Sequence, residues 1–415
     1  MNNQEEKQNL QMEDKQDRKR WWHGFSFGVL CSAILFVIFC LVAAPSAITA
    51  LKPGGLSRAE AENLVNKVDL LLRTLEDQYL EEFDEEKLMD GLYHGMVSAV
   101  GDQYTRYYTA EEYQDYRSDT AGQYVGIGIS VRLADSGGAR VVELDENGPA
   151  KAAGLQIDDI LIEADGTDLT PLTLTEMVAI IKGEEGTSVE ITYERAGVSH
   201  TVSIERSTID NVTVKSELLE EGIGYISISG FEEVTTGQFQ NAIAALKEQS
   251  IQGLIVDLRN NLGGRVDVVQ KVTDELLPAG IITYTEDKHG ERQVYESQDD
   301  PNLDLPLVVL VNGSSASASE IMAGAIQDRG AGILVGTTTY GKGIVQLTTP
   351  FSDGTAIKVT MAKYYTPNGN YIHGIGIKPD IYIELPEGTV LSTLAHEDDI
   401  QLQTALEAMR TQLGR

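Results

Sequence analysis

The chain has 415 residues, which is too long for one hydrophobic core and indicates several domains. Its formal net charge at pH 7 is -32, which argues against nucleic acid as a partner and against adhesion of the folded part to anionic lipid. The 6 histidines form no pair with metal-ligand spacing. We therefore predict no metal, no cofactor and no nucleic-acid partner.

An apolar segment at residues 25–46 is long enough to span a bilayer, for which about 20 apolar residues are needed. Arg18, Lys19 and Arg20 precede it, so the positive-inside rule places residues 1–24 in the cytoplasm as a tail. A cleaved signal peptide is the alternative reading, because small residues follow the segment. Both readings export the remainder, and the first predicts a single-pass protein of the cell membrane.

Helical patterns mark both ends of the exported part. Ser57 and Glu60 form a capping box at the start of an N-terminal helical region, residues 56–118, and a second helix follows at about 84–100. The apolar stripes of these helices fit either an intramolecular contact or a homodimer interface. A C-terminal helical region, residues 387–415, contains an amphipathic helix at about 398–413, for which the N-terminal helices are one packing partner to consider.

Residues 119–207 show the pattern of short strands that is typical of a small β-domain. Strand-like runs occur at 125–133, 140–144, 160–164, 188–194 and 202–204, with helices at 149–154 and 174–182. The most informative stretch is Gly126, Ile127, Gly128 and Ile129. Glycines before a strand can leave backbone N–H groups free for a peptide's C-terminal carboxylate, while the strand edge pairs with the peptide backbone. A plain turn or bulge is the ordinary alternative.

Residues 208–386 alternate strand and helix patterns, which predicts an α/β core built from βαβ-type units. Within it, a buried strand at 305–311 leads into the run Ser-Ala-Ser-Ala-Ser-Glu at residues 315–320, and then into a helix. Lys342 lies between two glycines further along. The predicted fold class is multidomain α/β (α+β overall), with one transmembrane helix.

The residue types in this core fit one chemistry. A serine hydroxyl is a poor nucleophile unless a neighbouring base takes its proton, and a lysine can be that base only when its pKa is lowered. Lys342 and Gln346 share one face if they lie on one strand, so Gln346 could hydrogen-bond the amine. Read from these residues alone, an N-cap serine and a solvated turn lysine are the ordinary alternatives.

Several ordered motifs carry a family resemblance. Gly-Ile-Gly-Ile at 126–129 with Asn-Gly-Pro-Ala-Lys-Ala-Ala-Gly-Leu at 147–155 resembles a circularly permuted PDZ domain. Together with Asp-Leu-Arg-Asn-Asn-Leu-Gly-Gly at 257–264, the serine run and Gly-Lys-Gly at 341–343, residues from about 85 to 385 resemble the carboxy-terminal processing proteases, or tail-specific proteases. These are serine peptidases with a Ser–Lys dyad on a crotonase-like core.

The resemblance assigns roles to individual positions. It implies Ser317 as nucleophile, Lys342 as base and Gln346 as the residue that orients the lysine. It also implies an oxyanion hole from the N–H of Gly263 or Gly264 together with that of Ala318. The site residues implied are Ser317, Lys342, Gln346, Gly263, Gly264 and Ala318, with Gly126, Ile127, Gly128 and Ile129 for the peptide.

Lys182 stands where the family usually has arginine before glycine, which makes it a candidate latch between a peptide-bound PDZ domain and the protease core. A solvated lysine at a helix end is the alternative.

The sequence supports two classes of function. The first is a membrane-anchored endopeptidase, with its catalytic part outside the cytoplasm, that cuts exported proteins near their C-termini. The second is a catalytically silent PDZ scaffold that binds peptide tails.

Overall fold

The computed structural model describes residues 55–298 and 304–415. These residues belong to two compact units, residues 1–84 and 85–415, which we describe separately. Within the described residues, no helix combines the length and the apolar character needed to cross a bilayer. The apolar segment 25–46 and the tail before it lie outside the described residues.

The first unit contributes one described helix, α2 (Arg58–Gln78). The predicted capping box is confirmed, because Ser57 N–H donates to Glu60 Oε2 at 2.8 Å and Glu60 N–H donates to Ser57 Oγ at 3.3 Å. None of the side chains of α2 is buried. Its apolar stripe is therefore not buried within the described part of its own unit.

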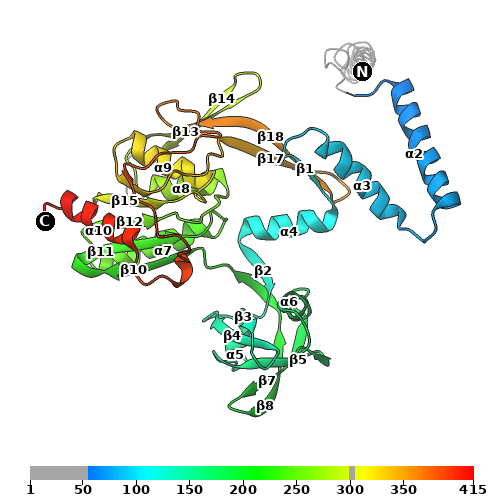
Figure 1. Cartoon of the computed structure of the whole chain (residues 1–415), viewed down its shortest axis with the longest axis horizontal. Coiled ribbons are helices and arrows are strands. Elements are labelled where there is room, and N and C mark those ends of the chain that lie inside the picture. The colour runs from blue at the N-terminus through cyan, green and yellow to red at the C-terminus, as the bar shows by residue number, and fades with distance from the viewer. Residues whose placement is uncertain (1–54, 299–303) are drawn as a thin grey trace, which may run out of the picture. The chain divides into compact units, whose positions relative to one another are not determined.

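The second unit contains the protease-like core and the β-domain (Figure 1). Its helices are α3 (Glu85–Ser98), α4 (Ala110–Ala121), α5 (Pro149–Ala152), α6 (Leu174–Ile181), α7 (Thr235–Glu248), α8 (Val266–Asp274), α9 (Ala318–Asp328) and α10 (Ile400–Gln412). Its strands are β1 (Arg106–Tyr108), β2 (Gln123–Gly126), β3 (Ile129–Leu133), β4 (Ala139–Leu144), β5 (Ile160–Ala164), β6 (Thr167–Asp168), β7 (Ser188–Arg195), β8 (Val198–Glu205), β9 (Ser207–Asp210), β10 (Val214–Leu219), β11 (Ile223–Ile228), β12 (Gly253–Asp257), β13 (Gly280–Asp287), β14 (Arg292–Ser297), β15 (Leu307–Val311), β16 (Ile333–Gly336), β17 (Ile344–Pro350), β18 (Ala356–Tyr365) and β19 (Ile381–Tyr382).

The centre of the core is a six-stranded sheet with the order β10-β11-β12-β15-β16-β19. Its strands are parallel except β10, which pairs antiparallel with β11 at one edge. Strands of such a sheet are buried on both faces, which explains why β12 and β15 read as uninterrupted apolar runs. Alternate residues accordingly join two different clusters: Val256 packs with α7, α8 and α9, and Ile255 packs with α10.

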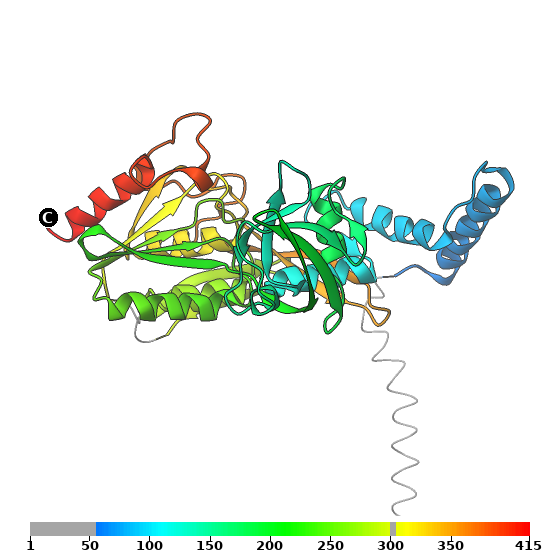
Figure 2. The ribbon, with the colours of Figure 1, turned by 90° about the horizontal axis from the view of Figure 1, so that it is seen from below.

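Helix α10 covers one face of this sheet and α7 the other, as Figure 2 shows. Leu402, Ala405 and Met409 of α10 are buried against the apolar side chains of β11, β12 and β15. The predicted packing of this helix on the N-terminal helices is therefore wrong.

A second sheet borders the first and has the order β1-β18-β13-β14, with β17 paired to β18. The β-domain is a separate layer, with the strand order β3-β4-β5-β7-β8 and its own apolar cluster that includes Ile127, Leu161 and Met177. Strands β2 and β9 form a two-stranded ribbon through which the chain enters and leaves this domain. The predicted mixed α/β architecture is confirmed.

Candidate active site

The loops after β12 and β15 lie together at the carboxyl ends of these strands, because the two strands are neighbours with the same direction. Their amides hold the loops together: Asn312 Nδ2 donates to Asn260 Oδ1 at 2.8 Å, and Asn260 N–H donates to Asn312 Oδ1 at 3.0 Å. The backbone carbonyl of Asn261 accepts from Ala316 N–H at 3.0 Å. The serine run is thus fixed against the glycine-containing loop.

Two of the three serines in the run have structural hydrogen bonds. Ser315 Oγ donates to Leu258 O at 2.8 Å, and Ser319 Oγ donates to Asn261 O at 2.9 Å, and both residues are fully buried. Ser317 differs, because it is only partly buried and its Oγ donates no hydrogen bond to any of the described residues. The middle hydroxyl is therefore the one available for chemistry.

The backbone at Ser317 is strained. Its φ of 56° and ψ of -112° lie outside the regions that residues with a Cβ prefer, at the turn between β15 and α9. Sharp turns of this kind present a nucleophile above the end of a sheet. The same turn places Ser317 at the N-terminus of α9, where backbone N–H groups point outward.

Gly263 and Gly264 lie against this turn. A Cβ on Gly263 would fall 2.6 Å from Ala316 O and 2.9 Å from Ser317 Cβ, so this close approach requires glycine. Gly263 N–H is already used, because it donates to Asn261 Oδ1 at 2.8 Å. Among the described residues, neither Gly264 N–H nor Ala318 N–H has an acceptor. The geometry favours Gly264 with Ala318, rather than Gly263, as the pair of oxyanion donors.

Glu320 connects the serine turn to the lysine loop. Its buried carboxylate accepts from Ser317 N–H at 2.9 Å and from Lys342 N–H at 2.8 Å through Oε2. Through Oε1 it accepts from Thr339 Oγ1 and from Gly341 N–H, each at 2.6 Å. The motif marks Glu320 only as the last residue of the run at 315–320. The capping-box spacing from Ser317 was the available signal for its contact with the serine turn.

Lys342 lies in the loop just before β17 and is partly buried. Burial lowers the pKa of Lys342 from its ordinary value of 10.5, and the nearby charge of Lys358 lowers it further, while Asp102 and Glu320 oppose the shift. The Nζ atom lies 4.6 Å from the centroid of the Tyr104 ring. No hydrogen bond joins Lys342 Nζ to Ser317 Oγ in the described structure.

Gln346 does not contact the lysine amine here. Its Nε2 donates to Thr360 Oγ1 at 3.3 Å. Lys342 precedes the strand, and the register of β17 against β18 shifts between Val345 and Gln346, so the predicted period-two relation between the two side chains fails. His373 contacts the same loop, since its Nδ1 accepts from Gly343 N–H at 3.4 Å.

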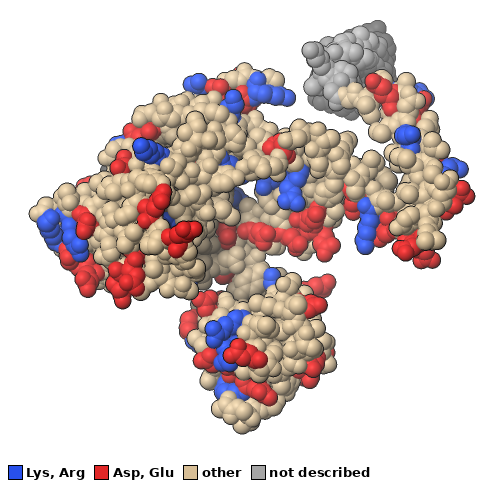
Figure 3. Space-filling model, viewed as in Figure 1, with Lys and Arg blue, Asp and Glu red and all other residues tan. Residues whose placement is uncertain are grey.

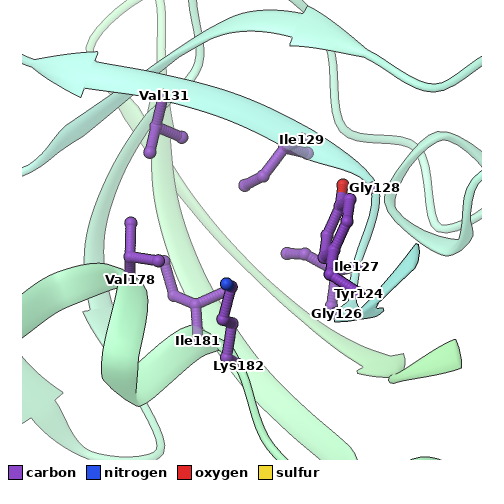
Figure 4. Close-up of a pocket in the computed structure, with 9 residues that line it drawn as sticks. All are labelled: Tyr124, Gly126, Ile127, Gly128, Ile129, Val131, Val178, Ile181 and Lys182. Carbon is purple, nitrogen blue, oxygen red and sulfur yellow. The ribbon is translucent and has the colours of Figure 1, made fainter. Parts of the chain in front are cut away.

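The four predicted peptide-binding residues border one groove of the β-domain, between β3 and α6 (Figure 4). The groove is lined by Tyr124, Gly126, Ile127, Gly128, Ile129, Val131, Val178, Ile181 and Lys182. Lys182 ends α6, and its Nζ points into the groove, 5.6 Å from the centroid of the Tyr124 ring. The groove is therefore apolar, with one ammonium group at its end.

Comparisons with known proteins agree with this architecture. Residues 222–383 match the model of peptidase family S41, residues 125–205 match a PDZ domain, and residues 30–112 match the N-terminal domain of the activating protease CtpB. The S41 family is a Ser–Lys dyad family. The class defined by fold and motifs is thus a serine-type peptidase that carries a PDZ domain.

Among its relatives, the carboxy-terminal processing protease CtpA of Bacillus subtilis is 33% identical over 362 residues, covering 85% of this chain and 78% of the relative. A CtpA-like serine protease of Staphylococcus aureus is 31% identical over 398 residues, covering 93% and 78%. The solved photosystem II D1 C-terminal processing protease is 29% identical, with 77% and 88% covered and a TM-score of 0.45. The chain belongs to the carboxy-terminal processing proteases, and the predicted serine-type peptidase activity is confirmed.

Proposed function

We propose that this peptidase is anchored in the cell membrane by residues 25–46, receives the C-terminal tails of exported proteins in its PDZ groove, and cleaves them with Ser317 and Lys342. The observation that carries the catalytic assignment is the hydroxyl of Ser317. In the part of the chain that is described, it is the one hydroxyl in the serine run that donates no hydrogen bond, and it stands at a strained turn beside two free N–H groups.

The proposed reaction follows from these groups. Neutral Lys342 takes the proton of Ser317 Oγ as the oxygen attacks the scissile carbonyl, and the ammonium then protonates the leaving amine. The N–H groups of Gly264 and Ala318 stabilise the negative charge that develops on the carbonyl oxygen. Water then releases the acyl group from Ser317. The attack requires Lys342 Nζ to turn from the Tyr104 ring toward Ser317.

The test is to incubate the full-length chain in detergent with exported proteins and to identify new termini by mass spectrometry. We expect cleavage near C-termini by the wild type and none by Ser317→Ala. Cleavage by the purified Ser317→Ala variant at the wild-type rate would overturn the assignment of the nucleophile. Cleavage sites distributed without regard to the C-terminus would overturn tail recognition while leaving the catalytic assignment intact.

The membrane topology is a separate part of the proposal. Arg18, Lys19 and Arg20 before the apolar segment place the tail inside and the peptidase outside. Protease added to intact cells should therefore digest the region after about residue 50 and spare the tail. Protection of the large region would reverse the proposed orientation.

The last part of the proposal is that two copies of the chain form a homodimer. The unpartnered stripe of α2 includes Leu64, Leu71 and Leu75, which are exposed in the described chain. A second copy of the chain would bury this stripe, whereas α10 is already covered by its own sheet. Sedimentation should show a dimer for the wild type and a monomer for Leu71→Glu. A monomeric wild type would overturn this part.

A further inference from the structure

Two cationic residues lie directly opposite each other where β1 pairs with β18, namely Arg106 and Lys358. Directly opposed residues of an antiparallel pair share one face of the sheet, where two like charges destabilise the pairing. No acidic side chain among the described residues forms an ion pair with either cation. In a chain with 64 acidic and 32 basic residues, this unpaired juxtaposition is unexpected.

An aromatic pair holds both cationic groups in place. The rings of Tyr108 and Tyr116 stack with centroids 5.1 Å apart. Arg106 Cζ lies 5.1 Å from the centroid of Tyr108, and Lys358 Nζ lies 4.9 Å from that of Tyr116. A ring face attracts a cation without neutralising its charge. The two positive charges are thus positioned side by side and remain available to an anion.

This basic pair borders the lysine of the active site. Lys358 is close enough to Lys342 for its charge to lower the pKa of Lys342, second to burial among the causes. Burial, followed by the charge of Arg106, lowers the pKa of Lys358 itself. Figure 3 shows a group of Lys and Arg side chains where Figure 1 places β1, next to a row of acidic side chains over α4. Lys342 Nζ also lies over the ring of Tyr104, which stands two residues before Arg106, so an anion bound by the pair would lie near Lys342.

We propose that Arg106 and Lys358 form a subsite for a carboxylate side chain of the substrate, an Asp or Glu residue close to the scissile bond. The inference rests on the proposed role of Lys342 as the catalytic base. The substrate's terminal carboxylate is already assigned to the PDZ groove, so a side-chain carboxylate is the anion left for this pair. Two adjacent donors, one of them a guanidinium, suit a carboxylate with its two oxygens.

The test uses the full-length chain and an internally quenched peptide that spans a cleavage site mapped by mass spectrometry. A single Glu is moved through the positions on both sides of the scissile bond, and each peptide is compared with its Gln counterpart. At one position we expect kcat/KM for the Glu peptide to exceed that for the Gln peptide by about tenfold, the scale of one charge-assisted hydrogen bond. The absence of any such position would overturn the proposal.

Variants of Arg106 and Lys358 test whether these two residues cause the preference for the Glu peptide. Lys358→Gln, and independently Arg106→Gln, should bring the ratio of the Glu and Gln peptides close to one. The ratio is measured within one enzyme, so changes in folding or in the Lys342 pKa cancel. Lys363→Gln is the matched control, because Lys363 also lies on β18 but contacts a different ring, Tyr371, at 5.1 Å. It should keep the preference. A preference that persists in both Lys358→Gln and Arg106→Gln would overturn the subsite.

The outcome also separates the subsite from the catalytic dyad. Cleavage of both peptides by Lys342→Ala at wild-type rates would contradict the proposed base and leave the ratio in the wild type unaffected. Equal rates for the Glu and Gln peptides in an enzyme that loses activity with Lys342→Ala would contradict the subsite alone.

Discussion

Lys342 is held between opposing influences on its charge. Burial and the neighbouring Lys358 favour the neutral amine, while the carboxylates of Asp102 and Glu320 favour the ammonium, and the net result is a pKa below 10.5. A general base must be unprotonated to act. The rate of cleavage should therefore rise with pH through an alkaline limb that reports the pKa of Lys342, and this limb should lie below 10.5.

The position of that limb tests the electrostatic role of Lys358. Replacing Lys358 with Gln removes a positive charge that disfavours the ammonium form of Lys342, so the pKa of Lys342 should rise and the limb should move to higher pH. Cleavage at neutral pH should fall in consequence. The pH dependence of kcat/KM for a Gln-containing peptide is the measurement, with Lys363→Gln as a control that leaves the limb in place. A limb that moves to lower pH would contradict this account.

At the scale of elements, the site is assembled by contacts between segments that are distant in the chain. Glu320 at the start of α9 fixes the loop before β17, and Arg259 at the end of β12 fixes the start of α10. Both carboxylate clusters are buried and are satisfied by several donors. Removing one member of such a cluster leaves the others unpaired, which costs more than the original interaction contributed.

Glu320→Gln should impair cleavage while changing no group that contacts the substrate. The new amide would present N–H donors toward at least one of the backbone N–H groups of Ser317 and Lys342, which now donate to the carboxylate. We expect kcat to fall at least tenfold and the free energy of unfolding to fall by about 1 to 3 kcal/mol. Kinetics and urea denaturation measure the two effects. Glu248→Gln on the exposed end of α7 is the control, and equal behaviour of the two variants would contradict the role of Glu320.

Asp399 tests how α10 is held to the sheet. Arg259 Nη2 lies 2.8 Å from Asp399 and 2.6 Å from Asp257, and all three side chains are buried. Asp399→Ala should lower the free energy of unfolding by about 3 to 5 kcal/mol, because the guanidinium loses one of its two buried carboxylate partners. The exposed neighbour Asp398→Ala should change it by less than about 0.5 kcal/mol. If Asp399→Ala also changed the free energy of unfolding by less than about 0.5 kcal/mol, the cluster would add no stability.

At the scale of the whole molecule, the sequence predicts an element well where burial imposes a regular pattern of apolar residues on it. The range of β5, residues 160–164, was predicted correctly, because a run of apolar or β-branched residues bounded by turns marks such a strand. Helix α4 was not predicted, since its twelve residues carry no apolar stripe and its first turn depends on a capping box at Thr109. The hairpin of β13 and β14 was also not predicted.

The active site likewise combines residues that a motif marks and contacts that no local pattern marks. Ser317 and Lys342 were identified through their motifs, and Ser317 stands at the predicted strand-to-helix turn. The contacts of Lys342 with Tyr104 and Lys358 depend on tertiary packing that brings β1 beside β18, and no local pattern encodes that pairing. The bulge at Gln346 likewise depends on how β17 meets β18. The motifs thus lead to Ser317 and Lys342 as candidates, whereas the residues that surround them follow only from the fold.

Tail recognition by the PDZ groove belongs to this scale, since it concerns how the substrate reaches the active site. An apolar groove that ends at one ammonium group, Lys182, should favour an apolar terminal residue with a free carboxylate. Amidation of the terminus should weaken binding of a peptide to the full-length Ser317→Ala variant by about tenfold. Calorimetry gives the two affinities. Equal affinities for acid and amide would show that the carboxylate is not recognised.

The most direct test of the catalytic assignment compares the three serines of the run. Ser317→Ala should abolish cleavage with little change in the free energy of unfolding, because its hydroxyl donates no hydrogen bond to the residues that the structure describes. Ser315→Ala and Ser319→Ala should each lower that free energy by about 0.5 to 1.5 kcal/mol, since each removes one buried hydrogen bond, and the folded fraction should still cleave. The measurement is kcat/KM per folded molecule for the three variants. Wild-type cleavage by Ser317→Ala, or complete loss of cleavage in a folded Ser315→Ala or Ser319→Ala instead, would contradict the account.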